Sequence, residues 1–460
     1  MARRRRKAQP GPGGGRLSPT AAPRNGVAGG IAEAIAVAAL VLVIVGTALL
    51  VDPGAHASFE APKRLAALAG ISLAALAAFA LPFTPWEPGR AWRALPMESR
   101  VAAGALGAAI AWAGISALLS PRRPASLDSL RVLILYALLL PLGASRAAGR
   151  RKGLLVTAFL GASAVNAGVS LLQSGGIQPF RLQTFGTRNL TGALAGNVGY
   201  LALVVALAAV VSLGLALAAR SPLPRALAGA AFLLFLAALL VNRNLTAVLS
   251  LAVGGAVLVV ALFGRRALLP IAGVLAALVI TVFFYPPLAR QAGETVRLVR
   301  AGDWDRLTTY RLGAWTAAAE MTRERPLYGW GPGTYGAEFV PHRLSAEIRE
   351  RRRFVNPLVT SSYSEAHSDY LQAFAEAGVP GGVAVIVSAG ALATALVRRR
   401  PGAALPRLET AVLLGVLAAG AAAAATWFPL QRPITAVPLL LAAGRSWRLS
   451  AEASPDSSPE

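Results

Sequence analysis

His367 is the residue of this chain that is best suited to acid–base chemistry. It stands in the stretch Ser-Glu-Ala-His-Ser-Asp-Tyr-Leu, residues 364–371, where a long polar segment meets an apolar one. An imidazole titrates close to neutral pH, so it can accept or donate a proton during a reaction. We therefore predict a functional role for His367, against the alternative of a histidine that anchors the chain at a membrane surface.

The residues around His367 predict the start of a helix. Residues 362–365, Ser-Tyr-Ser-Glu, fit a capping box, so a helix is expected to begin there and to enter the next apolar run. The partial positive charge of a helix start would keep the imidazole neutral. On such a helix Tyr370 shares the face of His367, whereas Glu365 and Asp369 lie on the opposite face. Tyr370 is thus a candidate to hold His367, and the two carboxylates are expected to pair with arginines of the polar loop that precedes this helix.

Arg181, Arg243 and Arg311 complete the set of candidate residues. Arg181 lies in a loop rich in Gly, Gln and Thr, and Arg243 stands between two apolar runs. A guanidinium close to hydrocarbon is costly without an anionic partner, and its planar fork matches two phosphate oxygens. Several such groups at one place would hold a diphosphate without a metal. For Arg243, snorkelling of the side chain to the membrane interface is the alternative.

The chain that must position these residues has the composition of a polytopic membrane protein. Its 460 residues are 55% hydrophobic and only 14% charged. The apolar residues form runs of about twenty, a length that crosses a hydrocarbon core of about 30 Å. The fold class is therefore all-α integral membrane, with about 12 transmembrane helices. The spans are predicted near residues 31–51, 64–82, 101–119, 127–144, 153–173, 192–218, 223–241, 245–263, 267–285, 377–397, 408–427 and 432–444.

Basic residues predict the orientation of these spans. The formal charge is +24, and Lys and Arg are concentrated in the two termini and the loops on their side of the membrane. By the positive-inside rule that side is the cytosol, so the charge requires no nucleic acid as a partner. Residues 1–30 are predicted to be a disordered basic arm and residues 445–460 a disordered tail. The absence of cysteine excludes disulfides, thiolate metal sites and cysteine nucleophiles.

The same topology divides the rest of the chain into three parts. Residues 31–285 hold nine spans, residues 286–366 form one sizeable extracytoplasmic loop domain, and residues 367–444 hold three more spans. The loop domain is expected to be mainly helical, with helices over residues 306–323 and 341–354. The run Arg-Glu-Arg-Arg-Arg at 349–353 is interpreted as a solvated face.

Four tracts of the sequence resemble the O-antigen ligase and O-antigen polymerase superfamily. The first tract, Arg181 to Leu194, is similar to that family's arginine-containing outer loop, and the second, Asn242-Arg243, is similar to its Ser-Arg pair. The third tract, Arg311-Leu-Gly-Ala-Trp315 with Pro326-Leu-Tyr-Gly329-Trp-Gly331, is similar to the family's Arg helix and its Pro-x-x-Gly-x-Gly turn. The fourth tract, His367-Ser368 followed after nine residues by Gly378-Val-Pro-Gly381, is similar to the family's closing His motif. Two departures are Arg188, where proline is more usual, and Asn242 in place of serine.

The resemblance implies a GT-C type, metal-independent, inverting glycosyltransferase without a cofactor. Such an enzyme moves a glycan from undecaprenyl diphosphate to an acceptor hydroxyl on the periplasmic face of the bacterial inner membrane. The resemblance implies that Arg181, Arg311 and Arg243 bind the diphosphate and that His367 acts on the acceptor hydroxyl, with Tyr370 in support. It also implies motif or structural roles for Trp315, Pro326, Gly329, Gly331, Glu365, Ser368, Asp369, Gly378 and Gly381.

Two enzymatic functions and one other class remain open at this point. An O-antigen ligase, whose acceptor is lipid A-core, a glycan or a protein, is preferred because the spacing of the His motif matches that branch. A polymerase of O-antigen or exopolysaccharide repeats is the alternative. A secondary transporter is remote, because the ionisable residues of the spans lie toward span ends. No spacing of His, Asp and Glu predicts a metal centre.

Overall fold

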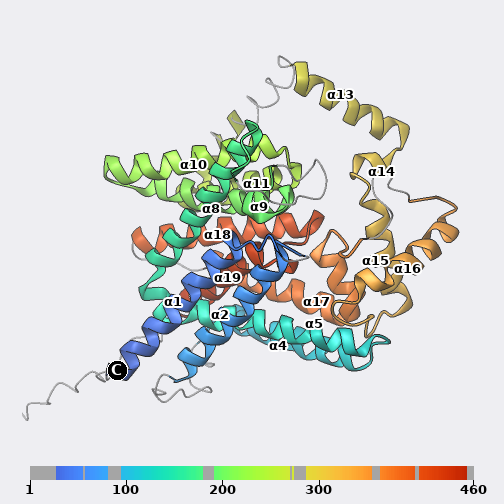
Figure 1. Ribbon diagram of the computed structural model, residues 1–460, viewed down its shortest axis with the longest axis horizontal. Coiled ribbons are helices and arrows are strands. Elements are labelled where there is room, and N and C mark those ends of the chain that lie inside the picture. The colour runs from blue at the N-terminus through green and yellow to red at the C-terminus, as the bar shows by residue number, and fades with distance from the viewer. Residues whose placement is uncertain are drawn as a thin grey trace, which may run out of the picture.

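The computed structural model describes residues 27–54, 57–80, 95–179, 191–269, 272–273, 286–354, 363–398 and 404–452. Within these ranges every regular element is a helix, as the all-α prediction required (Figure 1). The elements are α1 Val27–Leu49, α2 Glu60–Ala80, α4 Met97–Leu118, α5 Arg123–Ala137, α6 Leu139–Ala144, α7 Arg146–Arg150, α8 Lys152–Ser174, η2 Ala193–Ala195, α9 Val198–Ala218, α10 Pro222–Asn242, α11 Leu245–Phe263, η3 Gly264–Ala267, α13 Pro286–Ala301, α14 Trp304–Leu307, α15 Leu312–Glu324, α16 Tyr335–Glu350, α17 Asp369–Arg398, α18 Ala404–Thr426, η4 Pro429–Gln431 and α19 Pro433–Glu452.

Ten helices of the described residues are long and apolar enough to cross a membrane, and each matches a predicted span. The chain is thus a multi-pass membrane protein. The predicted ninth span, residues 267–285, lies for the most part outside the described residues. The predicted twelfth span falls in α19, which is not among these ten helices and which continues to Glu452 through a segment expected to belong to the tail. Its extension is stabilised by Arg445, whose guanidinium donates to Glu409 of α18 at 2.6 Å.

Helix α9 lies at the centre of the bundle. Its residues are apolar on all sides, and those from 201 to 212 are all buried, as is typical of a helix surrounded by other helices. Helices α8, α10, α11 and α18 pack against it. Small residues permit a close approach of α11 to α18: a Cβ added to Gly254 of α11 would lie 2.6 Å from the carbonyl oxygen of Gly415 in α18.

Polar contacts between loops gather at the two ends of the bundle. At one end, Lys63 donates to the carbonyl of Leu194 at 2.6 Å, and Arg432 pairs with Glu60. At the other end, Lys152 pairs with Glu409 at 2.5 Å. The loops at the first end are those that the predicted topology places outside the cytosol.

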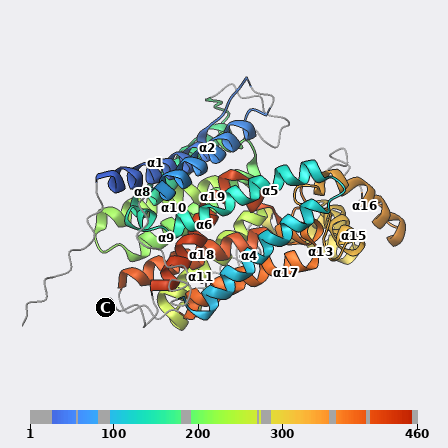
Figure 2. The same cartoon turned by 90° about the horizontal axis from the view of Figure 1, so that it is seen from below.

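Helices α13 to α16 form a separate region beyond one end of the bundle, next to the ends of α5 and α17 (Figures 1 and 2). The predicted continuous helix over residues 306–323 is wrong, because Thr309 and Tyr310 adopt left-handed backbone conformations and separate α14 from α15. The second predicted helix begins earlier than expected and includes Pro341. The carbonyl of Ala337, which Pro341 cannot bond, accepts a hydrogen bond from Arg122 at 3.4 Å.

A turn of this outer region is inserted into a break in α17. The backbone of α17 leaves the helical conformation at Gly378, where φ is 67°. Three backbone hydrogen bonds join the turn to the break: Trp330 N–H to Ala375 O at 3.1 Å, Gly331 N–H to Glu376 O at 2.8 Å, and Val379 N–H to Pro326 O at 2.7 Å. A Cβ added to Gly329 would lie 2.5 Å from the backbone of Glu376, so only glycine fits there. The glycine-rich turn and the Gly-Val-Pro-Gly segment are therefore two halves of one joint.

Candidate functional site

His367 lies just before α17, not within a helix. The predicted helix start at residues 362–365 is wrong, since α17 begins at Asp369 and His367 has a left-handed backbone with φ of 52°. Tertiary contacts hold this segment in its non-helical form. The N–H of Ala366 donates to the side chain of Gln372 at 3.1 Å, and the N–H of Asp369 donates to the carbonyl of Trp427 at 3.1 Å. Ser368, which is buried, caps the helix by accepting from the N–H of Leu371 at 3.3 Å.

The ring of His367 is surrounded by an aromatic cluster of Tyr363, Trp427 and Phe428. The ring centroids lie 5.0 Å, 5.2 Å and 5.0 Å from that of the imidazole. The indole N–H of Trp315 donates to the backbone carbonyl of His367 at 3.2 Å. The imidazole Nδ1 is buried and has no hydrogen-bond partner among the described residues. Both the ring and the backbone of His367 are thus fixed, while one ring nitrogen stays unused.

Burial lowers the pKa of His367 from its ordinary value of 6.5 to about 3, and the positive charges of Arg311 and Arg432 lower it further in the same direction. The imidazole is therefore neutral at physiological pH and able to accept a proton. A neutral ring was predicted from the charge of a helix start. The structure gives the same protonation state through burial and through two neighbouring guanidinium groups.

Arg311 shares the ring of Trp427 with His367. It stands at the N-terminal end of α15, and its guanidinium carbon lies 5.0 Å from the centroid of that indole. The same guanidinium donates to the carbonyl of Thr426 at 3.0 Å and to the hydroxyl of Thr246 at 3.4 Å. The structure therefore brings together two of the candidate residues, from opposite ends of the outer region.

The structure shows no such contact with the aromatic cluster for the other candidate arginines that it describes. Arg243 is exposed and ends α10 in a left-handed conformation with φ of 48°. It lies three positions before Thr246, the residue that binds Arg311, and hence at the same end of the bundle. Arg181, together with Arg188, falls outside the described residues.

Residues 230–386 match the sequence model of the O-antigen ligase family, Wzy_C. The chain carries an O-antigen ligase domain. This match confirms the resemblance that the motifs indicated, and it includes Arg243, Arg311, Trp315 and His367. No curated protein matches the chain.

Three predicted contacts within the O-antigen ligase domain are wrong in detail. The hydroxyl of Tyr370 donates to the carbonyl of Ala421 at 3.0 Å and not to His367, and so fastens α17 to α18. Asp369 accepts from the backbone N–H of Leu430 at 2.9 Å instead of pairing with an arginine. Glu365 does pair with an arginine, but with Arg432, which lies outside the loop domain. The assumed helical faces caused these errors, because residues 363–368 are not helical.

The loop between α18 and α19, residues 427–432, is the part of the site that the sequence prediction missed. It reads Trp-Phe-Pro-Leu-Gln-Arg and follows the residues matched by the O-antigen ligase family. Trp427 and Phe428 stack on each other and both face His367. One signal was available: this short loop carries two aromatic residues and an arginine, and the predicted topology already placed it on the side of His367.

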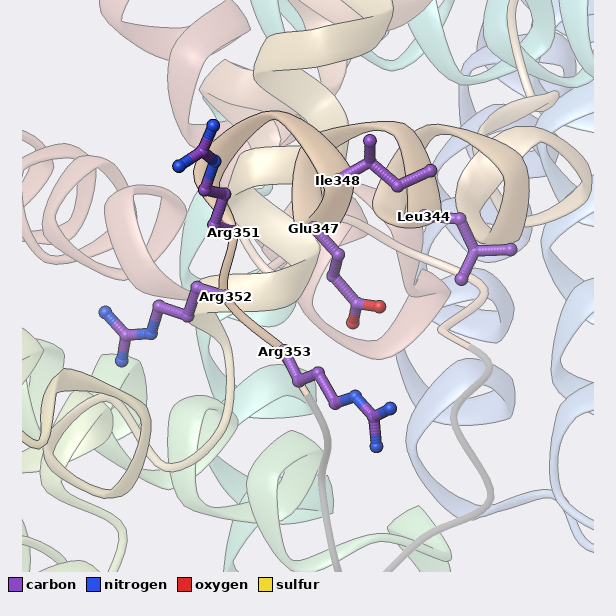
Figure 3. A pocket seen from close by; sticks show the side chains of 6 residues that line it. All are labelled: Leu344, Glu347, Ile348, Arg351, Arg352 and Arg353. Atoms are coloured by element: carbon purple, nitrogen blue, oxygen red, sulfur yellow. The ribbon is translucent and has the colours of Figure 1, made fainter.

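A second basic region lies at the end of α16, at a hollow lined by Leu344, Glu347, Ile348, Arg351, Arg352 and Arg353 (Figure 3). The three arginine side chains point in different directions (Figure 3). Arg352 pairs with Asp305 at 2.7 Å. This geometry is that of a solvated basic face, as interpreted from the sequence, and not of a convergent anion site. Within the part of the chain that the structure describes, no group of three or more His, Asp or Glu side chains could hold a metal ion.

Proposed function

We propose that this protein transfers a glycan from undecaprenyl diphosphate to an acceptor hydroxyl, as an O-antigen ligase-like glycosyltransferase. The family match supports a membrane glycosyltransferase of the O-antigen ligase or polymerase type. The observation that carries the finer proposal is the placement of His367 and Arg311 against the same indole ring. The imidazole of His367 can take a proton, and the guanidinium of Arg311 can neutralise a phosphate.

The reaction requires both of these groups. The neutral imidazole of His367 accepts the proton of the acceptor hydroxyl as its oxygen attacks the anomeric carbon of the donor sugar. The bond between that carbon and the diphosphate oxygen breaks, and the leaving diphosphate takes the electron pair. Arg311, with Arg243 and Arg181, neutralises the charge that develops on the diphosphate. Attack opposite the leaving group inverts the anomeric centre.

We propose the same three arginines as the reason that no metal ion is needed. A diphosphate is a good leaving group, and guanidinium groups can supply the positive charge that a divalent cation supplies in other glycosyltransferases. Transfer should then persist in EDTA. Loss of activity that Mg²⁺ restores would contradict this part of the proposal.

The proposed location is the bacterial inner membrane, with both termini in the cytosol and the site on the periplasmic face. The distribution of basic residues supports this orientation. The proposed partners are the carrier-linked glycan, an acceptor such as lipid A-core, and the bilayer. The domains proposed from the sequence, with residues 286–366 as the periplasmic loop, agree with this arrangement.

The decisive experiment compares wild-type protein with His367→Ala in membranes supplied with a carrier-linked glycan donor. We expect no transfer by the variant, with unchanged insertion and abundance. Full activity would remove His367 from the mechanism. The motifs also allow a polymerase. Deletion in the native host would separate the two functions: unattached full-length polymer indicates a ligase, and single repeat units indicate a polymerase.

A further inference from the structure

We propose that Arg432 is a positioning residue of the transfer reaction, which fixes the segment carrying His367 by holding Glu365. The inference rests on the proposed function, because it assigns Arg432 a task only if His367 is the base. It concerns a residue that follows the stretch matched by the O-antigen ligase family, residues 230–386.

Arg432 is held by carboxylates on both sides. Its guanidinium pairs with Glu365, two residues before His367, and with Glu60 at the start of α2. The side chains of Arg432 and Glu365 are only 15% and 16% exposed, so solvent screens this pair far less than a surface ion pair. Arg432 therefore ties the histidine segment to the membrane bundle.

Aromatic rings fix the plane of the same guanidinium. Its central carbon lies 5.0 Å from the ring centroid of Tyr200 in α9 and 5.4 Å from that of Phe428. Phe428 in turn contacts the ring of His367. Arg432 thus reaches the histidine by two routes, through the backbone of Glu365 and through the ring of Phe428.

These contacts favour a positioning role over direct binding of the diphosphate. Two carboxylates already occupy the terminal nitrogens of Arg432, and its Nε is buried without a partner among the described residues. A diphosphate would have to displace Glu60 and Glu365 and would approach their negative charges.

The charge of Arg432 gives the proposal a measurable consequence. Among the described residues, the charged or titratable groups around His367 include Arg311 at the start of α15, Arg432, and Glu365 and Tyr363 of its own segment. The positive charge of Arg432 disfavours a protonated imidazole. Removing that charge should raise the pH at which activity is lost on the acid side.

The test compares Arg432→Gln, Arg432→Lys and Glu365→Gln with a matched control, Arg445→Gln. The Arg445–Glu409 pair is equally buried, with 16% and 17% exposure, and lies at the opposite end of α19. We expect Arg432→Gln to lower kcat about tenfold, with the KM of the donor changed less than about twofold. Its acid limb should move to higher pH. Arg432→Lys should recover part of kcat and keep the wild-type acid limb.

The double variant supplies a second criterion. If Arg432 acts through Glu365, Arg432→Gln combined with Glu365→Gln should be no slower than Arg432→Gln alone. A decrease no larger than that of Arg445→Gln, or a rise in the KM of the donor with unchanged kcat, would overturn the proposal. If Arg432→Gln does not accumulate in the membrane, Arg432→Lys and Glu365→Gln decide by the same criteria. An active His367→Ala variant would instead overturn the proposed function.

Discussion

The indole of Trp315 donates a hydrogen bond to the backbone carbonyl of His367 at 3.2 Å. The two residues belong to separate motif tracts, and this contact joins the two tracts at one place. His367 is held in a left-handed conformation that is unfavourable for a residue with a side chain. Trp315 therefore helps to maintain a strained backbone at the proposed base.

Replacing Trp315 by phenylalanine tests this contact. The change keeps an aromatic ring but removes the N–H, so we expect kcat for glycan transfer to fall about tenfold, with a loss of stability of only about 1 kcal/mol. Kinetics in membranes and thermal unfolding in detergent measure the two effects. Trp304→Phe, at a side chain that is 45% exposed, is the control. Equal kcat for the two variants would refute the role of Trp315.

Replacing Arg311 tests the proposed diphosphate contact. Arg311→Ala should lower kcat/KM for the carrier-linked donor about a hundredfold, because it removes a group that stabilises developing charge. Arg311→Lys should recover only part of this, since an ammonium lacks the guanidinium fork. Arg300→Ala, at an exposed position of α13, serves as the control. If Arg300→Ala has the same effect, Arg311 has no special relation to the donor.

The depressed pKa of His367 predicts how activity depends on pH. With a pKa of about 3, the imidazole remains neutral as the pH falls through 6.5, so activity should not decline there as it would with an ordinary histidine base. Stability should behave differently. Below about pH 6.5 the unfolded chain binds a proton at this histidine that the folded protein excludes. The free energy of unfolding should therefore decrease as the pH falls from about 6.5 to about 3.

A pH profile of kcat, measured with His342→Gln as a control for the histidine of the loop domain, checks this expectation. His342 lies 3.1 Å from Glu324 and does not belong to the aromatic cluster. If kcat falls at acid pH with a midpoint near 6.5, and does so in His342→Gln as well, the result would contradict a buried neutral base.

Glycine at position 329 should be irreplaceable. Gly329→Ala adds a Cβ 2.5 Å from the backbone of Glu376 at a residue with φ of 67°. We expect a loss of stability of about 1–3 kcal/mol, measured by thermal unfolding in detergent. Gly293→Ala, where an added Cβ meets nothing within 4 Å, should be neutral or slightly stabilising. Equal stabilities would mean that the turn does not depend on its fit to α17.

The proposed orientation can be measured directly, because the chain contains no cysteine. A single cysteine at position 348, where the isoleucine is 80% exposed, should react with a membrane-impermeant maleimide added from the periplasmic side. A cysteine in place of Arg151, at the opposite end of the bundle, should react only after the membrane is opened. The reverse pattern would invert the topology and remove the proposed periplasmic site.

The sequence predicted the spans well and the local geometry of the site less well. Span positions follow from the lengths of apolar runs, which a bilayer restricts strongly. The conformation of residues 363–368 depends on partners such as Gln372 and Trp427, and these overrode the capping signal before His367. Arg432 could not be paired with Glu60 from the sequence, since 372 positions separate them. Family motifs located His367 and Arg311, but the residues that hold them lie partly outside those motifs.

The joint between the glycine-rich turn and the break in α17 has a consequence for protein engineering. The first turns of α17, residues 369–377, are hydrogen-bonded to Trp330 and Gly331 of the outer region. They are therefore expected to move with that region, although they are continuous with a membrane helix. A chimera that exchanges residues 286–366 alone between two such proteins would separate these partners. A functional graft should cross over after Gly381, so that the first turns of α17 and the whole break travel with the domain they support.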